Sequence, residues 1–174
     1  MTWRKTTPWR PKHAVNAVVA GAVVSMFAVS WAVGGFPDLG ATETKLKADD
    51  PRVVGRGEVV YMEHCASCHG RALEGEAEWK SQDGDGYLPA PPHDESGHTW
   101  HHPDKLLFKM VKFGVAEAAN LTDYKTKMPS FGESLSDAEI VATLSYIKSR
   151  WPQDIRSRHD QLNRIYEERE RSVK

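Results

Sequence analysis

Two cysteines and a histidine stand close together in the run Cys65-Ala66-Ser67-Cys68-His69. The chain has no other cysteine, so no thiol is left over. Two thiols at this spacing can each form a thioether with one vinyl group of a haem, and the adjacent imidazole then reaches the iron from one face. The run therefore predicts one covalently attached haem c, with Cys65 and Cys68 as thioether residues and His69 as an axial iron ligand.

Two other uses of a Cys-x-x-Cys run are weaker interpretations here. A thioredoxin-like dithiol would accompany a βαβ pattern, and we find no strand pattern in the sequence. A structural zinc site needs four closed ligands, and the sequence offers no second cysteine pair.

The far face of the iron needs either a second axial ligand or an open position, and Met128 is the best candidate for a ligand. It lies in the run Lys127-Met128-Pro129-Ser130-Phe131, just before the last helix of the domain. A thioether is a soft ligand, and His/Met ligation raises the reduction potential of a haem. Met62 is too near Cys65 on the same helix to reach the far face, and Met110 sits within an amphipathic pattern that is typical of core methionines.

Histidines are also abundant in residues 93–102. They allow three hypotheses: bis-histidine ligation, a second metal such as copper, or a polar loop over the haem edge. We favour the polar loop, because the run His98-Thr99-Trp100-His101-His102 lacks the i, i+4 spacing of a preformed helical site. Trp100 is a candidate to donate its indole N–H to a haem propionate.

An uncharged segment, residues 14–36, precedes this region. In a helix it spans roughly 35 Å, enough for a hydrocarbon core of about 30 Å. Residues 1–13 carry four cations and no acidic residue, so the positive-inside rule keeps them in the cytoplasm and exports the rest. A cleaved signal peptide is the rival, but its apolar run is usually shorter. We therefore expect a single-pass anchor in a bacterial inner membrane, with the haem domain in the periplasm.

The rest of the chain has helical periodicity only. Residues 37–51 are interpreted as a polar linker, 52–151 as the haem domain and 152–174 as a charged helical tail. Ser136 and Glu139 form the sequence pattern of a capping box. Within the domain, helices are expected from Arg52 to the cysteine motif, over Asp104–Phe113 and from Ser136 onward, with long loops at 70–103 and 114–135.

These features resemble the membrane-anchored class I c-type cytochromes. The matching residues are Gly55 and Tyr61 before the Cys65-x-x-Cys68-His69 motif, and Met128-Pro129-x-Phe131 after a long loop. The resemblance implies an all-α, cytochrome c-like haem domain in which the first and last helices cross. It also implies electron carriage between membrane complexes such as a cytochrome bc complex and a terminal oxidase, and no enzymatic activity of the chain itself.

The net charge of the chain and its distribution exclude some classes of binding partner. The whole chain has a net charge of -1, which argues against a nucleic-acid binder. The 161 residues after the basic stub carry 19 basic and 24 acidic side chains, so docking through a ring of lysines is not expected. The alternatives to a mobile carrier are a fixed haem subunit of an oxidase, or a haem enzyme or metal-handling protein that uses the loop 93–102.

Overall fold

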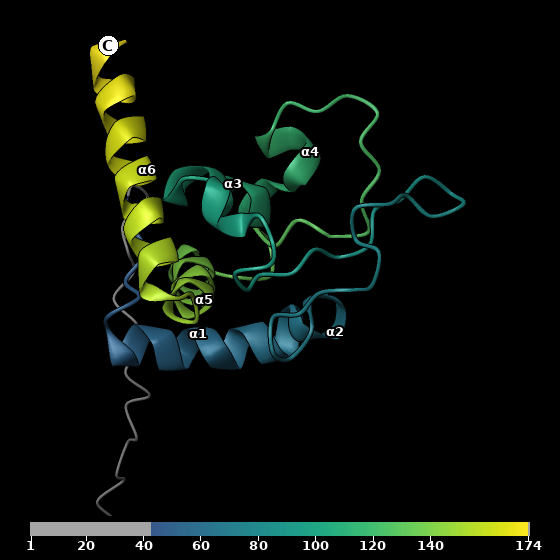
Figure 1. Cartoon of the computed structure of the whole chain (residues 1–174), viewed down its shortest axis with the longest axis horizontal. Coiled ribbons are helices and arrows are strands. Elements are labelled where there is room, and N and C mark those ends of the chain that lie inside the picture. The colour runs from purple at the N-terminus through teal and green to yellow at the C-terminus, as the bar shows by residue number, and fades with distance from the viewer. Residues whose placement is uncertain (1–42, 174) are drawn as a thin grey trace, which may run out of the picture. The chain divides into compact units, whose positions relative to one another are not determined.

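The computed structural model describes residues 43–173, and they form helices joined by long loops (Figure 1). No strand occurs among these residues, as expected for an all-α haem domain. The helices are α1 (Pro51–His64), α2 (Ala66–His69), the 3₁₀ turn η1 (Thr99–His101), α3 (Asp104–Phe113), α4 (Val115–Ala118), α5 (Asp137–Ser149) and α6 (Gln153–Ser172).

Nothing in residues 43–173 forms a helix with the length and apolar character needed to cross a bilayer. The expected anchor, residues 14–36, lies outside the described residues. The basic stub 1–13 and the first part of the expected linker lie outside them too.

Helices α1 and α5 cross in close contact, and a glycine makes this possible. A Cβ atom on Gly57 would lie 1.9 Å from the carbonyl oxygen of Ala142, whereas one on Gly55 would meet nothing within 4 Å. The backbones can approach only where the side chain is missing, so Gly57 is the crossing point.

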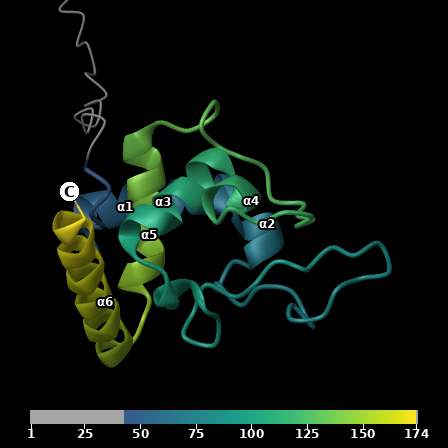
Figure 2. The same ribbon diagram turned by 90° about the horizontal axis from the view of Figure 1, so that it is seen from above.

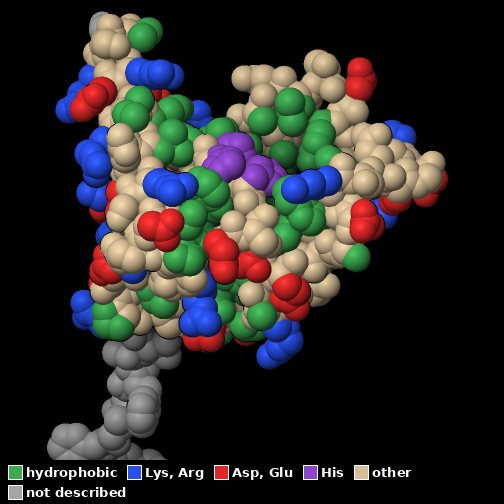
Figure 3. All heavy atoms as spheres, viewed as in Figure 1, with side chains coloured by type: hydrophobic (Ala, Val, Ile, Leu, Met, Phe, Trp, Pro, Cys, Tyr) green, Lys and Arg blue, Asp and Glu red, His purple; other side chains and the backbone are tan. Residues whose placement is uncertain are grey.

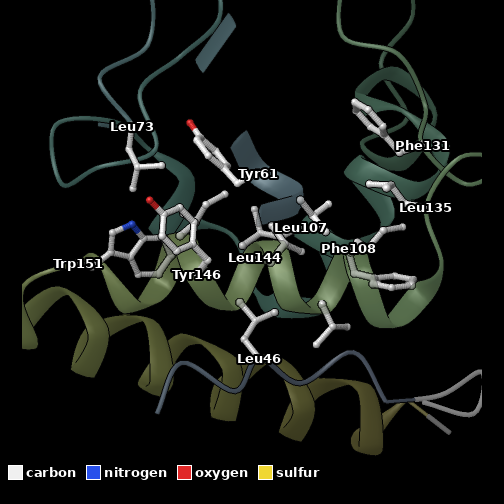
Figure 4. Close-up of a cluster of buried hydrophobic side chains, with 14 of the residues drawn as sticks. Leu46, Tyr61, Leu73, Leu107, Phe108, Phe131, Leu135, Leu144, Tyr146 and Trp151 are labelled. Carbon is white, nitrogen blue, oxygen red and sulfur yellow. The ribbon is translucent and has the colours of Figure 1, made fainter. Parts of the chain in front are cut away.

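The core lies where α1, α3 and α5 meet (Figure 4). Tyr61 and Tyr146 face each other across the α1–α5 crossing, with ring centroids 5.4 Å apart. Helix α5 is buried on nearly all sides, from Ile140 to Lys148. Its N-terminus carries the capping box expected from the sequence, because the Ser136 hydroxyl accepts from the Glu139 N–H and the Glu139 carboxylate accepts from the Ser136 N–H.

Helix α6 and the long loop after α2 lie on opposite sides of the domain (Figure 1, Figure 2). Helix α6 packs partly through polar groups, because Asn163 exchanges two hydrogen bonds with Asp104, at 2.8 and 2.9 Å. Residues 43–50, the end of the expected linker, also pack on the domain. Leu46 is buried in the core cluster, and its N–H donates to the other carboxylate oxygen of Asp104. The tail and the incoming chain are therefore held by one buried carboxylate.

A buried histidine makes the docking of α6 sensitive to pH. His159 is fully buried, and its Nε2–H donates to the carbonyl of His102 at 2.9 Å, while Nδ1 has no partner. Burial lowers the pKa of His159, and the charge of Lys148 lowers it further, against the opposing effects of Asp104 and Asp160. The unfolded chain therefore takes up this proton more readily than the folded one. The resulting stabilisation is complete above about pH 6.5 and is lost as the pH falls toward the lowered pKa.

We expect the free energy of unfolding to decrease between about pH 7.5 and about pH 5.5, and to decrease less in the His159→Gln variant. Denaturant titrations of both proteins at the two pH values measure this difference. Equal pH dependence in the two proteins would show that His159 does not contribute. Comparing the two proteins removes the contribution of the other histidines, which remain in the variant.

The segment 114–135 differs from its expected form. The sequence predicts a loop throughout this segment, but Val115–Ala118 forms the short helix α4. Gly114, at a φ of 97°, separates it from α3. A positive φ is accessible to glycine at little cost, so the chain turns there and begins a new helical turn. The remaining residues to Leu135 are irregular, as expected.

Candidate functional site

The cysteine–histidine motif lies on one helical turn. Cys65 ends α1, and the N–H groups of Cys68 and His69 both point to the carbonyl of Cys65, at 3.2 and 3.0 Å. Residues three and four apart share one face of a helix. The turn therefore presents Cys65, Cys68 and His69 on the same side, which is what attachment of one flat group by two thioethers and one imidazole requires.

The two cysteines have different surroundings. Cys68 is exposed, while Cys65 packs against the core cluster. Burial raises the pKa of the Cys65 thiol to about 11. A thiol with that pKa stays in its neutral form at neutral pH.

His69 is oriented by a backbone carbonyl. Its Nδ1–H donates to the carbonyl oxygen of Pro91 at 2.9 Å. Burial lowers the pKa of His69, which favours the neutral ring. A neutral imidazole with its proton on Nδ1 leaves the Nε2 lone pair free for a metal. The donors of this site, two thiols and an imidazole with a free Nε2, fit a covalently held haem.

The long loop 70–98 reaches His69 by folding back on itself. The carbonyl of Leu73 accepts from the N–H groups of His93 and Asp94, and the N–H of Glu76 donates to the carbonyl of Ala90. Gly75, at a φ of 68°, leaves no room for a side chain, because a Cβ atom there would lie 2.5 Å from the nitrogen of Pro92. These contacts bring Pro91 beside the motif although 22 residues separate it from His69.

Met128 lies on a second loop that is anchored to α3. The N–H groups of Phe131 and Gly132 donate to the carbonyls of Val111 and Lys112, each at 2.9 Å. The Met128 side chain is partly buried and packs against the same core cluster as Cys65. The structure thus places the expected ligand in contact with the core that also receives the motif.

The two loops touch at their outer ends. The Lys127 ammonium pairs with the Asp83 carboxylate at 3.0 Å, and the ammonium groups of Lys127 and Lys125 lie 5.0 and 5.8 Å from the centre of the Tyr87 ring. The Lys125 ammonium also donates to the carbonyl of Asp85 at 2.9 Å. These contacts connect the loop that orients His69 to the loop that carries Met128.

Histidine side chains gather at the base of a notch beside α6 (Figure 3). His98 stacks on Trp79, with centroids 5.3 Å apart, and its ring edge faces His102. Across residues 43–173, no group of three His, Cys, Asp or Glu side chains is arranged to hold a metal ion. The indole N–H of Trp100 points to the carbonyl of Glu95 at 3.4 Å, a long hydrogen bond, and its propionate contact stays a prediction.

The sequence alone does not distinguish His93 from the other histidines of residues 93–102. It also does not indicate that Thr99 forms a hydrogen bond with His93. The ring of His93 stacks on that of His69, with centroids 4.0 Å apart and an angle of 22° between the rings. Burial lowers the pKa of His93 well below its usual value, and the neighbouring His69 and His98 lower it further. The only signal in the sequence was its place two residues after Pro91.

One of three comparisons with known proteins found a match, to a protein family. The family described as cytochrome C oxidase, cbb3-type, subunit III matches residues 53–147, which include the whole motif, Pro91 and Met128. Searches of curated proteins and of solved structures found no match. The family is one of c-type cytochromes that act in electron transfer through haem. Because the match covers more than half of the chain, this protein belongs to the family of cbb3-type cytochrome c oxidase subunit III.

Proposed function

We propose that the chain is a one-electron carrier with a single covalent haem c, held by Cys65 and Cys68 and ligated by His69 and Met128. One observation carries the proposal: the motif lies on a single turn with His69 Nδ1 bonded to Pro91, so that Nε2 is free. A free dithiol enzyme would have no use for an imidazole fixed in this tautomer. A zinc site would need four ligands, and within residues 43–173 no group of three His, Cys, Asp or Glu side chains is arranged to hold a metal ion.

Met128 is supported as the second ligand by its anchored loop. Backbone hydrogen bonds to α3 on one side and the Lys127–Asp83 pair on the other restrain the residues around it. Met62 lies on α1 three residues before Cys65, and Met110 lies within helix α3. Neither is on a loop that is free to approach the exposed side of the motif.

Haem iron supplies a site that takes up and releases one electron. The chain supplies the rest. Pro91 keeps the His69 proton on Nδ1, and the core around Tyr61 and Tyr146 excludes water from one side of the motif. Ligands held on two anchored segments move little between oxidation states, which favours rapid electron transfer.

We infer that the carrier acts on the exported face of a bacterial inner membrane, tethered by residues 14–36. Its partners would be a cytochrome bc complex as donor and a terminal oxidase as acceptor. A second candidate role is that of a fixed subunit of such an oxidase. The family description favours it, because it names an oxidase subunit. Copurification with an oxidase in mild detergent would support the fixed subunit; recovery of the chain alone would support the mobile carrier.

Covalent attachment is tested by producing the chain in a host that matures c-type cytochromes and separating it on a denaturing gel. We expect haem to remain on the wild-type band, and to be lost from the Cys65→Ala/Cys68→Ala double variant. Each single variant should keep one thioether and shift the pyridine haemochrome spectrum toward that of a haem with one free vinyl group. A wild-type band without haem would refute the proposed function.

A further inference from the structure

The ring of His93 contacts His69, Thr99 and Tyr61. Its Nδ1 shares a hydrogen bond with the hydroxyl of Thr99 at 2.8 Å, and Thr99 is itself buried. Its ring face lies 4.0 Å from that of His69, nearly parallel to it. The edge of the Tyr61 ring faces it from α1, with centroids 6.4 Å apart.

The backbone of His93 is fixed at both of its polar groups. Its N–H donates to the carbonyl of Leu73 at 2.8 Å, in the turn that follows the motif. Its carbonyl accepts from the indole N–H of Trp151 at 2.7 Å, and Trp151 is buried just after the end of α5. Three separate parts of the fold, the post-motif turn, η1 and the end of α5, therefore fix one loop histidine.

We propose that His93 is a positioning residue that sets the plane of the His69 imidazole. The Pro91 carbonyl fixes the tautomer of His69, but a single hydrogen bond to a carbonyl has a broad angular distribution and restrains the twist of the ring only weakly. A flat ring packed on the imidazole face restrains that twist. Groups behind a metal ligand commonly orient it in this way and tune the metal.

This inference rests on the proposed role of His69 as an axial ligand. The His93 side chain makes two kinds of contact, one through its ring face and one through its ring nitrogen. The flat ring contacts His69, whereas the ring nitrogen contacts Thr99. If the ring sets the plane, a flat ring without nitrogen will serve. If the hydrogen bond to Thr99 is what matters, a side chain with an amide will serve instead.

The test compares three variants of the oxidised holoprotein by electron paramagnetic resonance and by the haem-methyl shifts in proton NMR. Both spectra depend on the orientation of the axial imidazole. We expect His93→Ala and His93→Gln to change the resonance positions and the order of the methyl shifts. His93→Phe should keep both close to wild type. We also expect the reduction potential of His93→Ala to fall, because water entering the space of the ring favours the more highly charged oxidised state.

His98→Ala is the matched control, because His98 belongs to the same loop but stacks on Trp79 and not on His69. It should leave both spectra unchanged. Unchanged spectra in folded His93→Ala or His93→Gln would overturn the inference. If His93→Ala does not fold, His93→Gln against His93→Phe still decides it. Failure of the proposed function is seen separately, as wild-type protein without covalent haem or without histidine ligation.

Discussion

Replacing Met128 by alanine is expected to lower the reduction potential of the holoprotein by about 0.1 V or more, within the roughly 0.8 V that axial ligands span. A thioether stabilises reduced iron, so its loss favours the oxidised state. The open position should also bind cyanide in the oxidised protein and carbon monoxide in the reduced protein much faster than wild type. Redox titration and ligand-binding kinetics measure the two effects, and the weak far-red absorption band of methionine-ligated haem should vanish.

Met62→Ala and Met110→Ala are the matched controls, because they remove the same side chain from α1 and α3. Both should keep the far-red band and the slow ligand binding, whatever their effect on stability. An unchanged spectrum in Met128→Ala, or loss of the band in either control, would mean that another group occupies the second axial position.

The variants Gly57→Ala and Gly55→Ala are expected to change stability in opposite directions. A Cβ atom on Gly57 collides with the backbone of Ala142, and backbone atoms cannot move aside as a flexible side chain would. The helices must separate, and we expect the free energy of unfolding to fall by about 3 kcal/mol, at the upper end of overpacking effects. Gly55 has open space around it, so alanine there should stabilise the protein by about 0.5–1 kcal/mol through helix propensity.

Denaturant titration of the two variants measures the difference on one helix, two residues apart. Because the total stability of a domain is typically about 5–15 kcal/mol, the loss at Gly57 should also be visible as a lower thermal midpoint. Equal effects at the two glycines would show that α1 and α5 do not meet at Gly57 in solution.

Local patterns in the sequence identified the helices of the domain well. Asp104–Phe113 and the capping box at Ser136 were predicted at their observed positions, because amphipathic spacing and capping depend on residues within one or two turns. The helix α4 was missed, since four residues carry too little periodicity to be recognised. The distinct roles of Gly55 and Gly57 were also invisible, because they depend on which face of α1 meets α5.

The sequence by itself determined the attachment motif and the candidate ligands Cys65, Cys68, His69 and Met128, because each is defined by its residue type and its spacing along the chain. Only the tertiary structure decided what orients them. Pro91, His93 and the Asp83–Lys127 contact reach the site through loop closures of more than 20 residues. Such closures depend on backbone hydrogen bonds between distant residues and on close backbone contacts that only glycine allows. No local pattern along the chain therefore predicts them.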